Sequence, residues 1–118
     1  FITKDIQDKG KDIYLTEGIE DALTFAMNNK RSISLNSIAN LKSLMHYLSE
    51  DYVPCHKDRF VICFDHDSAG RKATQEMKDF FENYNQNPSN RYKYSYAVCE
   101  YPKQFKDIND YWISRIFS

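Results

Sequence analysis

Residues 59–71, with the sequence RFVICFDHDSAGR, decide the fold. The five residues after the opening arginine are apolar and show no alternation of polar and apolar side chains, which is typical of a strand covered on both faces. Acidic Asp65 and Asp67 follow at once, and Ser68 opens a stretch with apolar residues at helical spacing. The stretch therefore predicts a central strand, an acidic strand end and a helix that returns across the sheet.

Similar strand–helix units occupy the rest of the chain. Residues 12–16 and 32–35 read as short strands, and each is followed by apolar residues at helical spacing, the second with Asn36 or Ser37 as N-cap. Residues 92–98 read as a fourth strand, and Asp107 begins a last helix. Alternating units of this kind predict a Rossmann-like α/β fold, a parallel sheet of about four strands with helices on both faces.

Length and composition set limits on the whole. The 118 residues fit one domain, residues 1–118, and 42% hydrophobic residues argue against disorder. Apolar runs are too short for a membrane span, and the three separated cysteines argue against a disulfide framework, so we expect a soluble, cytoplasmic protein without a membrane partner. Because the chain begins at Phe1, we expect a fragment of a larger protein, monomeric by itself.

Acidic residues end two of the predicted strands. Glu17 ends the strand at residues 12–16, with Asp21 one helical turn further on, while Asp65 and Asp67 follow the apolar strand. Alternation along an extended segment would point Asp65 and Asp67 to the same side. Like charges that converge repel unless protons or a cation compensate, and oxygen ligands favour a hard ion such as Mg²⁺. Phosphate chemistry follows as a hypothesis.

Simpler roles exist for each acid alone. Asp67 or Ser68 could cap the helix that follows, Asp107 could cap the last helix, and Asp21 could be a solvated acid in a first helical turn. Acids at the carboxyl ends of two parallel strands nevertheless lie where ligands bind in such sheets. This joint placement favours a functional cluster over separate caps.

Two motifs resemble those of Toprim domains, especially the primase branch of bacteria, phages and related mobile elements. Residues 16–22, TEGIEDA, resemble the E-G-x-x-D signature, and residues 64–71, FDHDSAGR, resemble D-x-D-x-A-G-R. Residues 106–110, KDIND, resemble the later K-D-P-D-E element, with Ile-Asn-Asp in place of Pro-Asp-Glu. The resemblance extends from about Asp12 to Phe117, and it implies Mg²⁺-dependent formation or cleavage of phosphodiesters.

The resemblance also implies residue roles. Glu17 would be the catalytic general acid or base, and Mg²⁺, or Mn²⁺ as a substitute, would bind Asp65 and Asp67 with Asp21 and Asp107 as supporting acids. Candidates for contacts to phosphate or substrate are Gly18, Asn36, Ser37, Gly70, Arg71, Lys72 and Lys106.

The reaction itself stays open at this point. The A-G-R continuation and the K-D element favour primase-like nucleotidyl transfer in DNA replication, whereas a Toprim nuclease and a non-catalytic, metal-dependent nucleic-acid-binding module are alternatives. A haloacid-dehalogenase-type phosphatase is disfavoured because Ser68 and Ala69 replace the Gly-Thr or Gly-Val of that motif. No zinc ribbon or separate basic region is visible, so activity is expected to need flanking domains.

Net charge limits the partners. The chain carries a net charge of −1, which is not the basic footprint of a protein that binds nucleic acid by charge alone. We therefore expect weak binding of DNA, RNA and nucleotides by this chain, strengthened by a divalent metal.

Overall fold

The computed structural model describes residues 2–3, 12–18, 21, 23, 31–52, 58–90, 92–99, 101, 104, 107 and 111. Its sheet contains β1 (Ile2–Thr3), β2 (Asp12–Thr16), β3 (Arg31–Ser34), β4 (Arg59–Cys63) and β5 (Ser95–Val98), in the order β1-β3-β2-β4-β5. Strands β2 to β5 are parallel, and β1 pairs antiparallel with β3. The predicted parallel α/β fold is confirmed, with the two-residue edge strand β1 as an addition that was not predicted.

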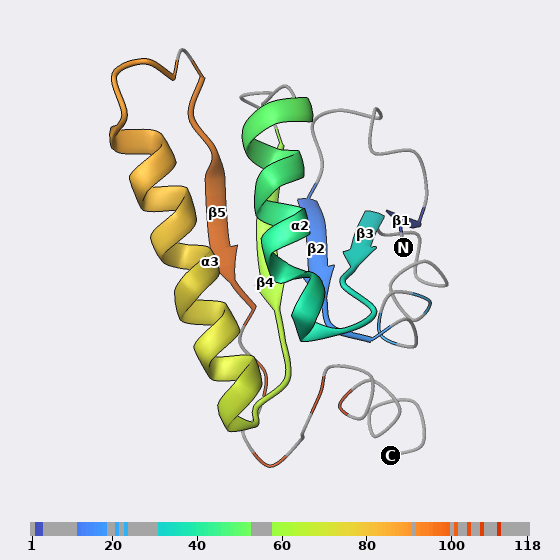
Figure 1. The fold of residues 1–118 in the computed structure, drawn as a ribbon. Helices are drawn as coiled ribbons and strands as arrows, with labels where there is room; N and C mark the ends of the chain where they lie inside the picture. The colour runs from blue at the N-terminus through green and yellow to red at the C-terminus, as the bar shows by residue number, and fades with distance from the viewer. Residues whose placement is uncertain are drawn as a thin grey trace.

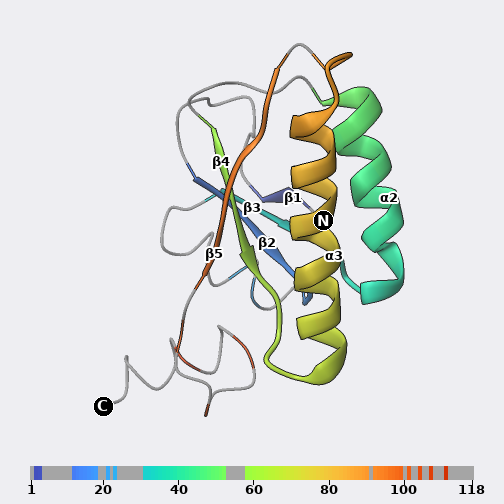
Figure 2. The same cartoon turned by 90° about the vertical axis from the view of Figure 1, so that its left-hand side faces the viewer.

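The described helices lie after β3 and β4. A helical segment runs from η1 (Ile38–Asn40) through α2 (Leu41–His46) to a π-helical turn, η2 (Tyr47–Asp51), and α3 spans Ser68–Gln86. Figure 1 shows the arrows of the parallel strands pointing to the edge at which both segments begin, and Figure 2 shows both helices on one side of the sheet. The connections that contain these helices, from β3 to β4 and from β4 to β5, run in the same direction along the sheet, so right-handed crossovers place both helices on this side.

The sheet has apolar side chains on both faces, as the unbroken apolar run in β4 predicts. Phe60 and Ile62 of β4 pack into the core under α2 and α3. Val61 and Cys63, which alternate with them, form a second cluster with Tyr101, against which Tyr111 packs. Tyr111 is helical, and so are Asp21 and Leu23, while the rest of the two helices predicted around them lies outside the described residues. Strand β4 is therefore an inner strand covered on both faces, next to the middle strand β2.

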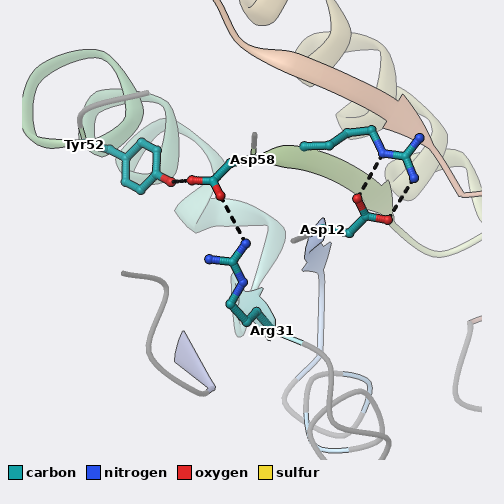
Figure 3. Close-up of polar contacts among 5 residues, drawn as sticks. Asp12, Arg31, Tyr52 and Asp58 are labelled. Atoms are coloured by element: carbon teal, nitrogen blue, oxygen red, sulfur yellow. Dashed lines mark hydrogen bonds and ion pairs between the residues drawn. The ribbon is translucent and has the colours of Figure 1, made fainter. Parts of the chain in front are cut away.

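A buried ion pair lies at the edge of the sheet where the strands begin (Figure 3). Arg31, the first residue of β3, donates from Nη2 to Asp58 Oδ1 at 3.2 Å, and both side chains are 1% exposed. Tyr52 donates its hydroxyl to Asp58 Oδ2 at 2.5 Å. The Asp58 carboxylate therefore receives a hydrogen bond on each oxygen, which is the condition for burying a charge at acceptable cost.

A second ion pair nearby is exposed. Arg59 donates to both carboxylate oxygens of Asp12, at 3.1 Å from Nε and 2.8 Å from Nη2. The two residues are cross-strand partners in β4 and β2.

No helix within the described part of the chain is both long and apolar enough to cross a membrane.

Candidate metal and nucleotide site

The strand order places a topological switch point between β2 and β4. From β2 the chain moves to β3 on one side and then returns across β2 to β4 on the other. In open parallel sheets, ligands bind beyond the carboxyl ends of the strands at such a reversal. Glu17 directly follows β2, and Asp65 lies two residues beyond β4, so both motif acids stand at this point.

Glu17 and Asp65 are joined by a hydrogen bond. The backbone N–H of Asp65 donates to Glu17 Oε1 at 3.0 Å. Both loops are thereby tied together immediately after the strands separate. The bond fixes the Glu17 carboxylate beside Asp65.

Gly70 is required by the close approach of α3 to this pair. A Cβ atom at Gly70 would lie 2.1 Å from the Asp65 carbonyl oxygen and 2.6 Å from Glu17 Oε1. Its backbone N–H donates to Asp67 Oδ1 at 2.7 Å. The structure thus accounts for the glycine of the second motif by packing, and its predicted contact with phosphate stays a prediction.

Three carboxylates converge at the switch point. One oxygen each from Asp21, Asp65 and Asp107 lies within 4.8 Å of the other two. Asp21 follows β2, Asp65 follows β4, and Asp107 accepts at its carbonyl oxygen a hydrogen bond from the Tyr111 N–H, as at the start of a helix. The sequence expectation that Asp21 and Asp107 join Asp65 therefore has a geometric basis.

Asp67 has a different position from these three. Its backbone is extended, and its side chain caps α3 through the hydrogen bond from Gly70. The side-chain capping role, one of the two interpretations of Asp67 open from the sequence, is thus present. A metal contact by Asp67 stays a prediction.

Repulsion among the acids affects the pKa of Asp65. Burial, followed by the negative charges of Glu17, Asp21, Asp107 and Asp67, raises the pKa of Asp65 to about 7. The raised pKa means that the ionised form of Asp65 is disfavoured at this position, first by burial and then by the neighbouring negative charges. A bound cation would reverse the effect, because it favours the ionised form.

A pocket of about 420 Å³ opens at the acids. It is lined largely by residues that the sequence singled out: Glu17, Gly18, Asp21, Asn36, Ser37, Ile38, Asp65 and Asp107. Asn36 adopts φ 65°, in the left-handed region, and its N–H donates to Ser34 Oγ at 3.1 Å. Ser37 caps the following helical segment by accepting from the Ala39 N–H at 3.3 Å. The turn after β3 thus brings both polar residues to the acids.

The predicted basic contacts lie beside this pocket. Arg71 and Lys72 are exposed in the first turn of α3. Arg71 lines a second pocket, which also includes Asp65, and Lys72 lines a groove between α3 and the helical segment after β3. Lys106 lies outside the described residues, so its role stays a prediction.

Sequence reasoning missed the contacts that Tyr101, which follows β5, makes with the loop of Asp65. Tyr101 donates its hydroxyl to the Phe64 carbonyl oxygen at 3.0 Å. Its ring stacks on that of His66, with centroids 3.8 Å apart and planes at 6°. Tyr101 thus contacts the residues on both sides of Asp65, and only its place just after the fourth predicted strand could have suggested it.

Together, fold and site define a class: a small parallel α/β domain with carboxylates gathered where β2 and β4 end. The family model described as Toprim-like matches residues 14–112, and the chain belongs to this family.

A solved structure shares the fold. The primase fragment of the bacteriophage T7 primase-helicase protein aligns with a TM-score of 0.61 and 24% sequence identity. The alignment covers 92% of this chain and 41% of that fragment, so the chain corresponds to less than half of it. A comparison with curated protein sequences finds no match.

Proposed function

We propose that this chain is the Mg²⁺-dependent catalytic domain of a primase-like protein, which transfers nucleotides to form phosphodiester bonds in DNA replication of a bacterium, phage or mobile element. The observation that carries the proposal is the convergence of Asp21, Asp65 and Asp107 within 4.8 Å beside Glu17. Membership of the Toprim-like family and the likeness to a primase fragment support it.

The donor set fits a hard divalent cation. Asp21, Asp65 and Asp107 offer only carboxylate oxygens, the ligands that Mg²⁺ and Mn²⁺ accept together with water and phosphate. The raised pKa of Asp65 indicates that the acids lack a compensating positive charge. A metal held by these three residues would neutralise charge on a phosphate and polarise its oxygens.

The chain's own residues would divide the remaining work. Glu17 would accept or donate the proton of the reacting hydroxyl, with its carboxylate fixed by the Asp65 N–H. Asn36 and Ser37, exposed at the pocket, would donate hydrogen bonds to phosphate, and Arg71 would supply positive charge from the start of α3. Asp67 would hold the helix start that carries Arg71, through its cap on Gly70.

Metal binding can be tested by calorimetric titration with Mn²⁺. We expect Asp65→Asn to lower the affinity at least about tenfold, because it removes one of the three converging carboxylates. Asp51→Asn is the matched control, since Asp51 is an exposed acid at the end of η2 and should leave the affinity unchanged. Equal affinities for wild type and Asp65→Asn would refute the site.

Proton transfer can be separated from metal binding with Glu17→Gln. Glutamine retains an oxygen that can accept from the Asp65 N–H, so the loop geometry and the Mn²⁺ affinity should change little. Nucleotidyl transfer by the parent protein should fall by about 10²–10⁴-fold, the usual contribution of a general acid or base. Undiminished transfer would remove Glu17 from this role, and lost Mn²⁺ binding would reassign it as a ligand.

The reaction type needs an assay with both outcomes in one mixture. A 5′-labelled single strand is incubated with Mg²⁺ and nucleoside triphosphates that carry a second label. The label on the strand reports its cleavage, and the label on the nucleotides reports extension or new synthesis. Synthesis supports the primase-like proposal, whereas cleavage that disappears in Asp65→Asn identifies a nuclease. Metal-dependent binding with neither product identifies a non-catalytic nucleic-acid-binding module.

A further inference from the structure

A second pocket adjoins the acids and is chemically different from the first. Its volume is about 270 Å³, near the lower end for small-molecule sites, and it shares Asp65 with the acidic pocket. Ile62, Phe64 and Val98, at the carboxyl ends of β4 and β5, supply apolar walls. The two pockets therefore meet at one carboxylate, one suited to metal and phosphate and the other to an apolar group.

Polar groups interrupt the apolar lining at a few points. Arg71 and Thr74 come from successive turns of α3, and His66 comes from the loop between Asp65 and Asp67. The Nδ1 atom of His66 is buried and has no hydrogen-bond partner within the described part of the chain. Stacking on Tyr101 restrains the plane of the imidazole. A buried unpaired nitrogen is unfavourable, and a ligand with a matching polar edge would correct it.

The combination fits a planar group with apolar faces and polar edges. A nucleobase has this chemistry. In a nucleotide the base is joined to phosphates, which suit the neighbouring acidic pocket once a metal is bound there. Exposed Arg71 at the same pocket adds a positive charge that suits the phosphates or the face of the base. We propose that this second pocket binds the base of the nucleotide whose phosphates lie at Asp21, Asp65 and Asp107. This inference rests on the proposed function.

Two probes separate the base from the phosphates. The protein is titrated with ATP and with inorganic tripolyphosphate, both in excess Mg²⁺, by calorimetry. Tripolyphosphate reports the acidic site alone, whereas the ratio of the two dissociation constants reports the contribution of the nucleoside, and the variants below test the share of its base. We expect wild type to bind ATP at least about tenfold more tightly, since burying and stacking one base contributes on this scale.

Filling the pocket should remove this preference. Val98 is 41% exposed at the end of β5, so Val98→Trp can place an indole in the pocket with little change in the core. We expect ATP affinity to fall to that of tripolyphosphate while tripolyphosphate affinity stays unchanged. Ser95→Trp is the matched control, since Ser95 is exposed at the other end of the same strand. Thr74→Leu fills the pocket from α3 and provides a second test if Val98→Trp does not fold.

The outcomes distinguish the two proposals. Loss of the ATP preference in Val98→Trp or Thr74→Leu, but not in Ser95→Trp, supports a base site. An ATP preference that is absent in wild type, or that both filled variants retain, overturns it even when tripolyphosphate binds in an Asp65-dependent manner. If instead the tripolyphosphate affinity is the same with and without Mg²⁺ and is unchanged in Asp65→Asn, the proposed function is refuted.

Discussion

The two edges of the sheet differ in the charges that surround their carboxylates. Where β3 and β4 begin, Asp58 is matched by Arg31 and by the Tyr52 hydroxyl (Figure 3). Where β2 and β4 end, Asp21 and Asp107 lie against Asp65, and their charges add to the effect of burial in raising its pKa. We call the first the matched edge, because the counter-charge of Asp58 lies within the chain, and the second the unmatched edge, because its described acids carry like charges. The matched edge therefore suits a role in stability, whereas the three carboxylates of the unmatched edge could hold a metal ion.

The largest expected effect comes from breaking the matched edge. Asp58→Asn leaves the Arg31 guanidinium buried without its carboxylate, and we expect the free energy of unfolding to fall by about 3–5 kcal/mol. Urea denaturation at neutral pH measures it. Asp12→Asn is the control for an ion pair at the surface, where Arg59 is 51% exposed, and should cost at most about 1 kcal/mol.

A double variant tests whether pairing is the reason. Arg31→Met combined with Asp58→Leu removes both charges, so its cost should be well below the sum of the two single replacements. A fully additive loss would show that the two residues act separately and would weaken the contrast between the edges.

A smaller effect is expected from the packing of Gly70 at the unmatched edge. Gly70→Ala places a methyl group against the Asp65 carbonyl and the Glu17 carboxylate, so α3 must move outward. We expect a loss of about 1–3 kcal/mol in the free energy of unfolding, together with weaker Mn²⁺ binding, because both acids shift. Ser68→Thr, an added methyl at an exposed position of the same helical turn, should change stability by less than about 0.5 kcal/mol. Unaltered Mn²⁺ affinity in Gly70→Ala would separate helix packing from the metal site.

The two aspartates of D-x-D should respond differently to substitution. Asp67→Ala removes the cap on α3 and should cost about 1 kcal/mol, whereas Asp67→Asn should cost only a few tenths because asparagine caps helices nearly as well. Asp65→Asn should cost nothing without metal, since it removes a repelled charge. Mn²⁺ titration of Asp67→Asn then tests the predicted ligand role, which a loss of affinity comparable with that of Asp65→Asn would support.

Sequence patterns predicted the fold closely because the signals were local. Residues 12–16 form a strand with the expected bounds, and the apolar run from Arg59 ends as a strand at Cys63. The short edge strand β1 escaped prediction because two residues carry no periodicity. The strand expected from Tyr92 begins at Ser95, and Tyr94 instead is buried in the core with Phe60 and Phe81. Aromatic residues fit both settings, so composition alone could not set this boundary.

The sequence predicted which residues lie at the candidate site better than it predicted how their side chains are arranged. Parallel topology sends Glu17 and Asp65 to one edge, which alternation and motif spacing could foresee. The side-chain cap by Asp67 depends on where the extended backbone ends, and the grouping of Asp107 with Asp21 depends on contacts between segments far apart in sequence. The Arg31–Asp58 pair had no local signal at all, since a charged residue at a strand end is usually solvated.

The last expected effect is a pH dependence that arises from Asp65 at the unmatched edge. The pKa of Asp65 is about 7 in the folded protein, against about 3.9 in an unfolded chain. Since folding raises this pKa, protonated Asp65 favours the folded state. The stabilisation is fully present below about pH 4 and is lost as the pH rises through about 7. Unfolding free energies of wild type should therefore decline relative to those of Asp65→Asn across this interval and run parallel above it.

A divalent cation should reverse the sign of this difference. Saturating Mn²⁺ binds ionised Asp65 in the folded state, so above pH 7 wild type should become more stable than Asp65→Asn, and the gain should grow with Mn²⁺ concentration. Asp12→Asn, at the matched edge, should respond to Mn²⁺ like wild type, because its exposed partner Arg59 is remote from the acids. If the pH dependence of wild type and Asp65→Asn coincides with and without Mn²⁺, Asp65 carries no excess charge in the folded state, and the contrast between the two edges of the sheet disappears.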